Sequence, residues 1–288
     1  MSAAAESGPS KARSDAESSH ANMAPATAGE SHSQAELLGL AIVLARDAGA
    51  LLLERFQGGH ERVLASKSSP TDLVSEADLA SERLIRERLL QVRPADAFLG
   101  EEGGGKTGSS GLTWVIDPLD GTVNFLFSIP QWCVSVAVQD DAGVLAGAIF
   151  DPCRDELFGA TRDGAPTLNG APIAASERAD LASAMVATGF AYDASVRAVQ
   201  ADVFARLIPR VRDIRRFGSA ALDLAWTAAG RYDAYYERTV KPWDVAAGTL
   251  LCERAGLTVL ELPEHEALPL GVLAAVPALS GELFGLVG

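Results

Sequence analysis

Residues 114–125 read Trp-Val-Ile-Asp-Pro-Leu-Asp-Gly-Thr-Val-Asn-Phe, and this stretch decides the fold. Its three leading apolar residues predict the end of a buried strand. The carboxylates Asp117 and Asp120 follow, and Gly121 allows a tight turn before the hydroxyl and backbone N–H of Thr122. A strand that ends at paired carboxylates and turns through Gly-Thr can hold hard cations beside an anion-binding backbone. The stretch therefore predicts metal-assisted phosphate chemistry.

The first 34 residues differ in composition from the rest of the chain. They are rich in Ala, Ser, Gly and Glu and hold almost no large apolar side chains, so they cannot bury enough surface to offset their ordering entropy. We expect residues 1–34 to be a disordered tail and residues 35–288 to form the catalytic domain. The tail lacks the apolar centre of a secretory signal, and its acidic residues argue against a transit peptide.

Net charge and cysteine content limit the possible binding partners of the protein and its cellular compartment. The formal charge of −14 argues against a nucleic-acid-binding surface, and an anionic substrate would need metal ions or local dipoles to offset repulsion. No apolar run approaches the roughly 20 residues of a membrane span, so no membrane association is expected. The 3 cysteines are far apart and odd in number, which predicts core thiols in a reducing cytoplasm.

The hydrophobic pattern predicts a mixture of helices and strands. Helices are expected at 34–57, 75–92, 194–209, 219–229 and 243–255, with another at the C-terminus. Strands are expected at 113–117, in a hairpin of 132–139 with 144–150, in a pair of 156–161 with 172–174, and at 183–188, 212–217 and 232–236. Because strands and helices do not alternate steadily, the order favours a layered α/β fold with largely antiparallel pairing.

Four acidic residues stand out because each lies at the predicted end of an ordered element. They are Glu101, Asp117, Asp120 and Asp244. Magnesium prefers oxygen ligands, usually one or two carboxylates per ion, with waters and substrate oxygens completing its shell. Only 4 histidines are present, and two of them fall in the tail, so a zinc site or a histidine-based phosphatase is poorly supported.

Each carboxylate also has a simpler structural interpretation. Asp120 could belong to an ordinary turn, Asp244 could be a helix cap, and Glu101 could be solvated surface. A purely structural carboxylate cluster therefore stays an alternative. The complete run from Asp117 to Thr122 favours chemistry, because a turn needs neither two carboxylates nor the threonine. Haloacid dehalogenase-type phosphatases need Asp-x-Asp-x-Thr, a spacing that fails here, so a covalent aspartyl-phosphate is disfavoured.

Four motifs, in order, resemble the signatures of the inositol monophosphatase family. They are Lys-Ser-Ser-Pro-x-Asp-Leu-Val at 67–74, Gly-Glu-Glu at 100–102, Asp-Pro-Leu-Asp-Gly-Thr with Asn-Phe at 117–125, and Trp-Asp-x-Ala-Ala-Gly at 243–248. The chain is most similar to the bacterial branch, especially its actinobacterial inositol-1-monophosphatases. The resemblance implies a layered αβαβα sandwich with mixed, mostly antiparallel sheets, and a homodimer.

The same resemblance implies a set of metal ligands. Glu101, Asp117 and the backbone carbonyl of Leu119 would bind one Mg²⁺, and Asp117, Asp120 and Asp244 would bind a second. Thr122 and Glu101 would orient the attacking water. Lys67 and Asp78 match a loop near the metals, whereas Asp72 is interpreted as a loop anchor.

The resemblance also implies substrate contacts. The backbone N–H groups of Gly121 and Thr122 would meet the phosphate, close to Asp120 and Asp244. Further substrate-binding positions are Gly218, Ser219, Ala220 and Glu237. Glu237 would accept hydrogen bonds from polyol hydroxyls, although on its own it could be a surface carboxylate. The cations Arg215, Arg216 and Lys241 are interpreted as balancing the acidic surface and are left out of the site.

These observations lead to one expected function and several alternatives. We expect lithium-sensitive, Mg²⁺-dependent hydrolysis of a small phosphorylated polyol, inositol 1-phosphate, by an activated water in the cytoplasm. Histidinol phosphate, fructose 1,6-bisphosphate and 3′-phosphoadenosine 5′-phosphate are alternative substrates within the superfamily. A regulatory partnership with the transcription machinery is an alternative of a different class.

Overall fold

A computed structural model describes residues 33–58, 63–66, 73–103, 105–265 and 268–288. Within the unit that runs from His32 to Gly288, the described strands form three sheets. Two of these are large, and the third is a small antiparallel pair of β1 (Val63–Ser66) and β2 (Leu73–Ser75).

The larger sheet has seven strands in chain order. They are β3 (Ala97–Gly100), β4 (Thr113–Asp120), β5 (Cys133–Asp140), β6 (Gly143–Asp151), β7 (Glu156–Thr161), β8 (Thr167–Leu168) and β9 (Ala171–Pro172). Only β3 and β4 pair in parallel, and every other pairing in this sheet is antiparallel. The expected hairpin of 132–139 with 144–150 is present as β5 and β6.

The second sheet has five strands in the order β11 (Asp213–Arg215), β10 (Met185–Thr188), β12 (Ala234–Arg238), β14 (Gly271–Ala275) and β13 (Thr258–Leu262). β10 pairs in parallel with both β11 and β12, whereas β14 runs antiparallel to β12 and β13. The mixed, mostly antiparallel pairing that the sequence predicted is therefore confirmed.

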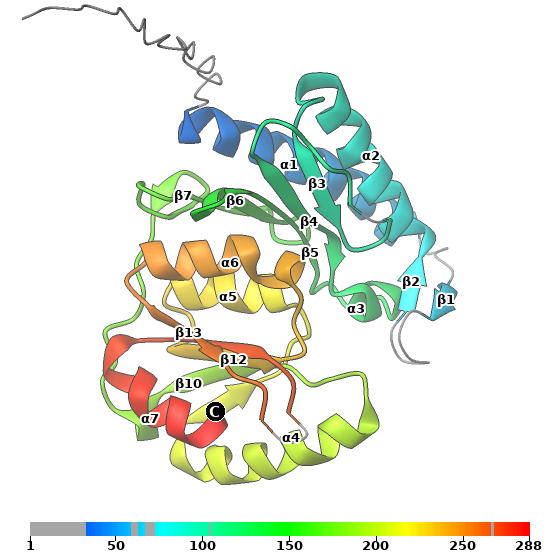
Figure 1. The fold of residues 1–288 in the computed structure, drawn as a ribbon. Coiled ribbons are helices and arrows are strands. Elements are labelled where there is room, and N and C mark those ends of the chain that lie inside the picture. The colour runs from blue at the N-terminus through cyan, green and yellow to red at the C-terminus, as the bar shows by residue number, and fades with distance from the viewer. Residues whose placement is uncertain (1–32, 59–62, 67–72, 104, 266–267) are drawn as a thin grey trace, which may run out of the picture. The chain divides into compact units, whose positions relative to one another are not determined.

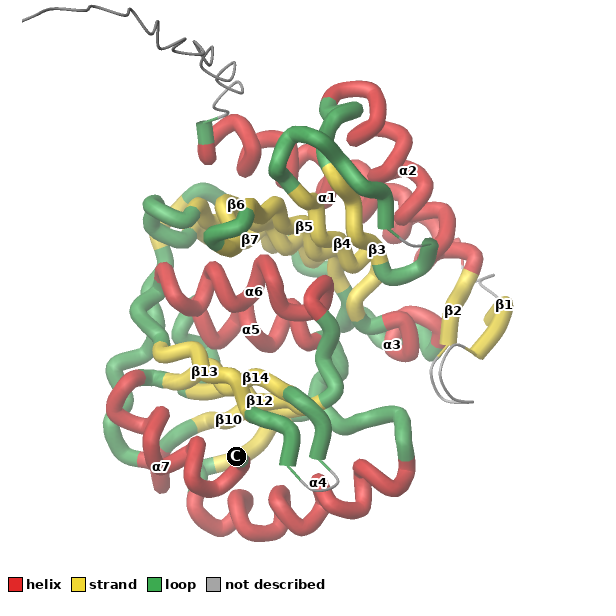
Figure 2. The backbone as a smooth tube through the Cα atoms, in the orientation of Figure 1, coloured by secondary structure: helices red, strands yellow, loops and turns green. Residues whose placement is uncertain are grey.

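Helices form three layers around these two sheets. α1 (Gln34–Gly58) and α2 (Glu76–Val92) pack on the outer face of the seven-stranded sheet, and α5 (Ala220–Ala228) and α6 (Pro242–Arg254) fill the space between the sheets (Figure 1). α4 (Ala194–Leu207) and α7 (Pro277–Val287) cover the outer face of the five-stranded sheet (Figure 2). The order of layers is the αβαβα sandwich that the family resemblance implied. Short 3₁₀ turns occur at Leu181–Ser183 and Ile208–Arg210.

The first two helices follow directly from their sequences. Residues buried by α1 recur every three or four positions, which places one apolar stripe against the sheet. α2 begins with a capping box: the hydroxyl of Ser75 accepts hydrogen bonds from the N–H groups of Ala77 and Asp78, and Asp78 accepts one from the N–H of Ser75. The predicted helices 34–57 and 75–92 are thus confirmed nearly residue for residue. Among the described helices, none combines the length and apolar character that a membrane span needs.

Two hydrophobic cores share the seven-stranded sheet between them. Alternate residues of β5 face opposite sides: Val134, Val136 and Val138 pack toward α1, whereas Cys133 and Ala137 pack toward α5 and α6. The first six residues of β5, Ser135 included, are therefore buried between the two cores.

Three details differ from the sequence-based expectation. β4 continues to Asp120 rather than ending at Asp117, because its register with β5 shifts between these two residues, at the proline. The segment 172–174 does not pair with 156–161, because β8 lies between β7 and β9. The short helix α3 (Thr122–Leu126) was predicted only as a turn.

Tertiary packing explains the last difference. The sequence Thr-Val-Asn-Phe-Leu has weak helix propensity. Phe125 nevertheless anchors the turn, because its ring packs 5.0 Å from that of Trp132 and 5.3 Å from that of Phe56, centroid to centroid. Phe56 belongs to α1 and Trp132 to the segment just before β5, so the helix depends on tertiary contacts that its own sequence pattern does not predict.

Candidate active site

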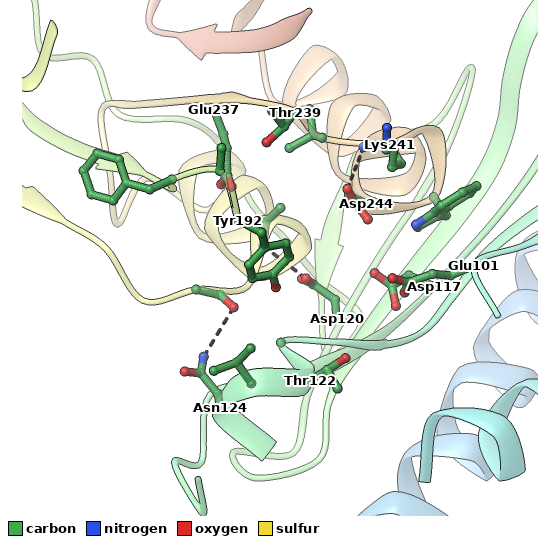
Figure 3. A pocket seen from close by; sticks show the side chains of 18 of the residues that line it. Glu101, Asp117, Asp120, Thr122, Asn124, Tyr192, Glu237, Thr239, Lys241 and Asp244 are labelled. Carbon is green, nitrogen blue, oxygen red and sulfur yellow. Dashed lines mark hydrogen bonds between the residues drawn. The ribbon is translucent and has the colours of Figure 1, made fainter. Parts of the chain in front are cut away.

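One cavity of about 420 Å³ collects nearly all the residues that the sequence singled out. It lies where the end of β4 approaches the ends of β12, α5 and α6 (Figure 3). The predicted residues that line it are Glu101, Asp117, Leu119, Asp120, Gly121, Thr122, Gly218, Ala220, Glu237 and Asp244. The fold therefore brings together positions that are more than a hundred residues apart in sequence.

The four predicted carboxylates reach this cavity from three elements. Asp117 and Asp120 lie on β4 with exposed fractions of only 2% and 9%, Glu101 follows β3, and Asp244 lies in the first turn of α6. Burial, together with the negative charges of Glu101, Asp120 and Asp244, raises the pKa of Asp117 well above its usual range. Burial raises the pKa of Asp120 to about 6 despite three hydrogen bonds that oppose the rise. The cavity is thus built to attract positive charge.

Hydrogen bonds from the backbone hold three of these carboxylates in place. Asp117 accepts from the N–H of Leu119 at 3.0 Å. Asp120 accepts from the N–H of Ala221 at 2.8 Å, in the first turn of α5, where the helix dipole favours an anion. Asp244 accepts from the N–H of Lys241 at 2.6 Å. The N-cap of α6 is Lys241, so the simpler interpretation of Asp244 as the N-cap is wrong. Asp244 lies three residues later, where its carboxylate accepts from the N–H of that N-cap residue, and it also lines the cavity.

The donor set fits a hard divalent cation. Among the described residues, no group of three or more His, Cys, Asp or Glu side chains is gathered closely enough to hold a metal ion as it stands. A Mg²⁺ site of one or two carboxylates needs no such group, because water and substrate oxygens complete its shell, whereas a site of three carboxylates would require these side chains to draw closer around the ion. The carboxylates here are crowded enough to raise one another's pKa, and all of their donor atoms are oxygens.

Thr122 is held by a residue outside the cavity lining. Its hydroxyl donates to a carboxylate oxygen of Asp78 at 2.8 Å and lies 3.1 Å from the carbonyl oxygen of Leu119. Asp78 is fully buried at the start of α2 and supports Thr122 from behind. The loop position that the resemblance implied for Asp78 is therefore wrong, because Asp78 lies in a helix. Lys67 and Asp72, which belong to the motif at 67–74, lie outside the described residues.

The segment that precedes α5 is positioned by two side chains. Ser219 does not line the cavity: its hydroxyl caps α5 and donates to Asp120 at 2.5 Å, so it supports a carboxylate rather than facing a ligand. The side-chain amide of Asn124 donates to the carbonyl oxygens of Gln131 at 2.8 Å and Phe217 at 2.7 Å. Asn124 thereby ties α3 to the backbone next to Gly218.

Glu237 lies on the wall formed by the end of β12, partly buried rather than on the open surface. The hydroxyl of Tyr235 donates to it at 2.9 Å. Gly189 packs directly against it, since a Cβ atom at Gly189 would overlap the carboxylate. Burial raises the pKa of Glu237 to about 7, with Tyr235 and the positive charge of Arg216 opposing the rise.

Sequence reasoning missed several residues of this site. Tyr235 could have been found, because it stands two residues before Glu237 on a strand and therefore faces the same way. Gly189 carries no local signal. Arg216 and Lys241 line the cavity, so leaving them out of the site was wrong. Arg215 does form an ion pair at the surface, 2.6 Å from Asp213.

The fold and this cavity define a class of protein: an αβαβα sandwich with a carboxylate-lined pocket suited to phosphate ester hydrolysis. Residues 33–283 match the inositol monophosphatase family, and the chain belongs to that family. It is 44% identical over 236 residues to the inositol-1-monophosphatase of Mycobacterium bovis, covering 78% of this chain and 81% of the relative. It is also 42% identical over 235 residues to the Nus factor SuhB of Xylella fastidiosa, covering 81% and 85%.

A solved structure agrees with this assignment. The extragenic suppressor protein suhB from Bartonella henselae superposes with a TM-score of 0.81 and 32% sequence identity, covering 88% of this chain and 98% of that one. The predicted fold class and family are therefore confirmed, and family membership supports phosphatase activity.

Proposed function

We propose that this protein hydrolyses inositol 1-phosphate to inositol and phosphate in a Mg²⁺-dependent reaction. The observation that carries the proposal is that one cavity joins four acidic residues at one wall with Glu237 at another. The first wall suits a metal-assisted phosphate, and the second offers a hydrogen-bond acceptor to the alcohol half of the substrate.

Two ion sites would share Asp117. Glu101, Asp117 and the carbonyl oxygen of Leu119 would hold one Mg²⁺, and Asp117, Asp120 and Asp244 would hold the other. Bound there, divalent ions lower the pKa of water and offset the charge of the phosphate. Backbone hydrogen bonds occupy one oxygen each of Asp117 and Asp244 and both oxygens of Asp120, and they fix the orientation of these carboxylates.

Thr122 and Glu101 would orient the attacking water. The single hydroxyl hydrogen of Thr122 is directed at Asp78, so Thr122 can only accept a hydrogen bond from that water. This contact would aim a lone pair of the water at phosphorus, opposite the departing alcohol oxygen. No protein nucleophile is required, and the configuration at phosphorus inverts.

The remaining cavity residues would bind the substrate. Gly121 and Thr122 would meet the phosphate through backbone N–H groups, and Gly218 with Ala220 would line the polyol side. Ser219 would act indirectly, by holding Asp120. Lys241 and Arg216 add positive charge to the rim of an otherwise acidic cavity. That charge helps to offset repulsion between the substrate and a chain of net charge −14.

A substrate panel tests the proposal. Phosphate release would be measured for inositol 1-phosphate, histidinol phosphate, fructose 1,6-bisphosphate and 3′-phosphoadenosine 5′-phosphate, with Mg²⁺, with EDTA and with added Li⁺. We expect the highest kcat/KM for inositol 1-phosphate, no turnover with EDTA and inhibition by Li⁺. Full activity in metal-free buffer would contradict the ion sites, and preference for another substrate would replace the inositol assignment.

A second candidate function rests on a different observation. A relative that is 42% identical is named Nus factor SuhB, so we also propose a partnership with the transcription machinery. Immobilised protein would be incubated with purified RNA polymerase, and retention that persists in Asp117→Asn would support a role separate from catalysis. Absence of binding at micromolar concentration would contradict it.

Assembly and compartment are proposals of the same kind. We propose a cytoplasmic homodimer. Its three cysteines are free, and Cys133 and Cys252 are buried, as expected for thiols kept in a reducing compartment. Sedimentation equilibrium would report the dimer, and a monomer at micromolar concentration would contradict it.

A further inference from the structure

Thr239 adopts a backbone conformation that its side chain disfavours. Four residues other than glycine have positive φ in the described chain: Ser128, Asp155, Asn169 and Thr239. The first three are small polar residues at turns, where the left-handed region is tolerated. Thr239 has φ of 72° and is the only β-branched member of this group, and branching at Cβ makes this region unfavourable.

The surrounding structure forces this conformation. The N–H of Thr239 donates to the carbonyl oxygen of Leu270 at 2.9 Å. The preceding residue, Arg238, is 2% exposed, and its guanidinium donates to the carbonyl oxygens of Pro263 at 2.7 Å and Val287 at 2.9 Å. These contacts fix the backbone on both sides of the Cα atom. Strain that persists because its surroundings determine it is concentrated at functional sites.

Thr239 also stands at a functional position. It lies in the connection between β12 and α6, two residues after Glu237 and five before Asp244, and it lines the same cavity (Figure 3). Its hydroxyl donates to the carbonyl oxygen of Arg238, so its only hydrogen is used within the protein. While this hydrogen bond is made, the hydroxyl oxygen of Thr239 has lone pairs that can accept a hydrogen bond from a ligand.

We propose that Thr239 is a specificity-determining residue that accepts a hydrogen bond from a substrate hydroxyl, beside the hydroxyl bound by Glu237. Two acceptors on one wall select an alcohol with at least two hydroxyl groups within reach, which a polyol phosphate has and a simple monoester lacks. A glycine would satisfy the backbone without strain but would remove the acceptor. This inference rests on the proposed phosphatase function.

Three substitutions at Thr239 distinguish the effect of its hydroxyl group from the effect of its strained backbone. Thr239→Val keeps the branched shape and removes the acceptor, Thr239→Ser keeps the acceptor and removes the branch, and Thr239→Gly removes both. For each, kcat/KM would be measured on inositol 1-phosphate and on p-nitrophenyl phosphate, and the melting temperature would be recorded. The ratio of the two kcat/KM values is the critical readout, because a general structural defect lowers both values together.

We expect Thr239→Val and Thr239→Gly to lower this ratio roughly fivefold, the effect of one lost neutral hydrogen bond, while Thr239→Ser preserves it. Thr239→Gly should raise the melting temperature by roughly 2–4 °C. Ser128→Gly is the matched control: Ser128 is exposed, has φ of 57° and does not line the cavity. It should affect stability without changing the ratio.

Failure of this inference differs from failure of the proposed function. If the unmodified protein releases no phosphate from either substrate, the phosphatase function itself is wrong. If it does release phosphate and Thr239→Val keeps the unmodified ratio, Thr239 does not select the substrate. A fall in melting temperature for both Thr239→Gly and Thr239→Ser would show that the conformation is not strained, and would overturn the argument from the backbone.

Discussion

The hydroxyl of Thr122 donates a 2.8 Å hydrogen bond to a carboxylate oxygen of Asp78, which lies 44 residues earlier in the chain. Both side chains are buried, and the bond joins the start of α3 to the start of α2. The other oxygen of Asp78 accepts from the backbone N–H of Ser75 at 2.9 Å. One carboxylate therefore serves both a helix cap and a residue of the active site.

This double role leads to the first prediction. Asp78→Asn keeps the shape of the side chain but removes the negative charge that draws the proton of Thr122. We expect kcat to fall roughly 100-fold, at the lower end of what a general acid–base group contributes, while the far-ultraviolet circular dichroism spectrum stays unchanged. Steady-state phosphate release on inositol 1-phosphate measures the effect.

Ser75→Ala is the control for the role of Asp78 in capping α2. It removes the hydroxyl that accepts from the N–H groups of Ala77 and Asp78, which costs about 1 kcal/mol of helix stability, and it also removes the 2.5 Å hydrogen bond that this hydroxyl donates to the carboxylate of Asp78. The melting temperature should fall by roughly 2–4 °C, with kcat nearly unchanged. If Ser75→Ala lowers kcat as much as Asp78→Asn does, the effect of Asp78 on turnover comes from its contacts with Ser75.

The second prediction concerns the crowding of negative charge around Asp117. Its pKa in the folded state lies above its unfolded value, so the folded protein binds more protons in the window above about pH 4. The metal-free protein therefore loses stability as pH rises through this window. Asp117→Asn removes that loss and should melt at a higher temperature than the unmodified protein at about pH 7, but not at about pH 4.

The same substitution should abolish turnover, because Asp117 is the carboxylate proposed to contact both ions. Added Mg²⁺ should raise the melting temperature of the unmodified protein and have little effect on Asp117→Asn. Differential scanning calorimetry at both pH values, with and without Mg²⁺, measures these differences. An equal response to Mg²⁺ in the two proteins would argue against Asp117 as a ligand.

The third prediction uses the raised pKa of Glu237. Because this pKa is about 7, the side chain is protonated below that pH and becomes a full acceptor above it. KM for inositol 1-phosphate should therefore fall as pH rises through about 7 in the unmodified protein. In Glu237→Gln, KM should be higher and should no longer follow this change. p-Nitrophenyl phosphate, which lacks the hydroxyl groups, is the control substrate. If its KM shows the same pH dependence, Glu237 does not bind the polyol hydroxyls.

The sequence predicted the residues that carry the chemistry of this site, but not the contacts that hold them in place. The carboxylates were found because each ends an element and stands in a short motif, so that local spacing already indicated their role. The bond between Thr122 and Asp78 could not be derived from spacing, since it depends on how α2 packs against the end of β4. Gly189 was missed for a related reason: it is a site residue only because β12 places Glu237 against it.

A structural role for a single residue does not exclude a role in the active site. Asp244 is not the N-cap of α6, which is Lys241, but its carboxylate accepts from the N–H of Lys241 and also lines the cavity, so one side chain supports the helix start and belongs to the site. The layered fold was predictable because strands and helices do not alternate steadily along the chain, and the family resemblance implied the order of the layers. The short helix α3 was not predictable, because its stability comes from the ring contacts of Phe125 with Phe56 of α1 and with Trp132.

The fourth prediction concerns the boundary of the catalytic domain. We propose that residues 1–34 are dispensable for turnover, but the structure places the best cut after residue 32. The hydroxyl of Ser33 accepts from the N–H of Glu36 at 3.2 Å, and Glu36 accepts from the N–H of Ser33 at 3.1 Å. Deletion of residues 1–32 should leave kcat and the melting temperature nearly unchanged, whereas deletion of residues 1–34 should lower the melting temperature. A large loss of kcat in the shorter deletion would assign the segment a role in the domain.

The last prediction tests whether the polyol wall depends on a glycine. Gly189 precedes the segment that leads into α4, and a Cβ atom there would overlap the carboxylate of Glu237. Gly189→Ala must therefore displace Glu237, and with it the hydrogen bond from Tyr235, which is now 2.9 Å long. The backbone of Gly189 does not have positive φ, so alanine adds no conformational strain of its own.

We expect Gly189→Ala to raise KM for inositol 1-phosphate about as much as Glu237→Gln does, with little change in kcat on p-nitrophenyl phosphate. The double variant should show no further increase, because both changes act on the same contact. Gly143→Ala does not serve as a control, since its φ of 117° would add strain, but Gly39→Ala does. A Cβ atom at Gly39 meets nothing within 4 Å, and its addition near the start of α1 should leave KM unchanged. Gly189→Ala could also leave KM for inositol 1-phosphate unchanged while Glu237→Gln raises it. In that case, Glu237 binds the substrate without needing the close packing of Gly189 against its carboxylate.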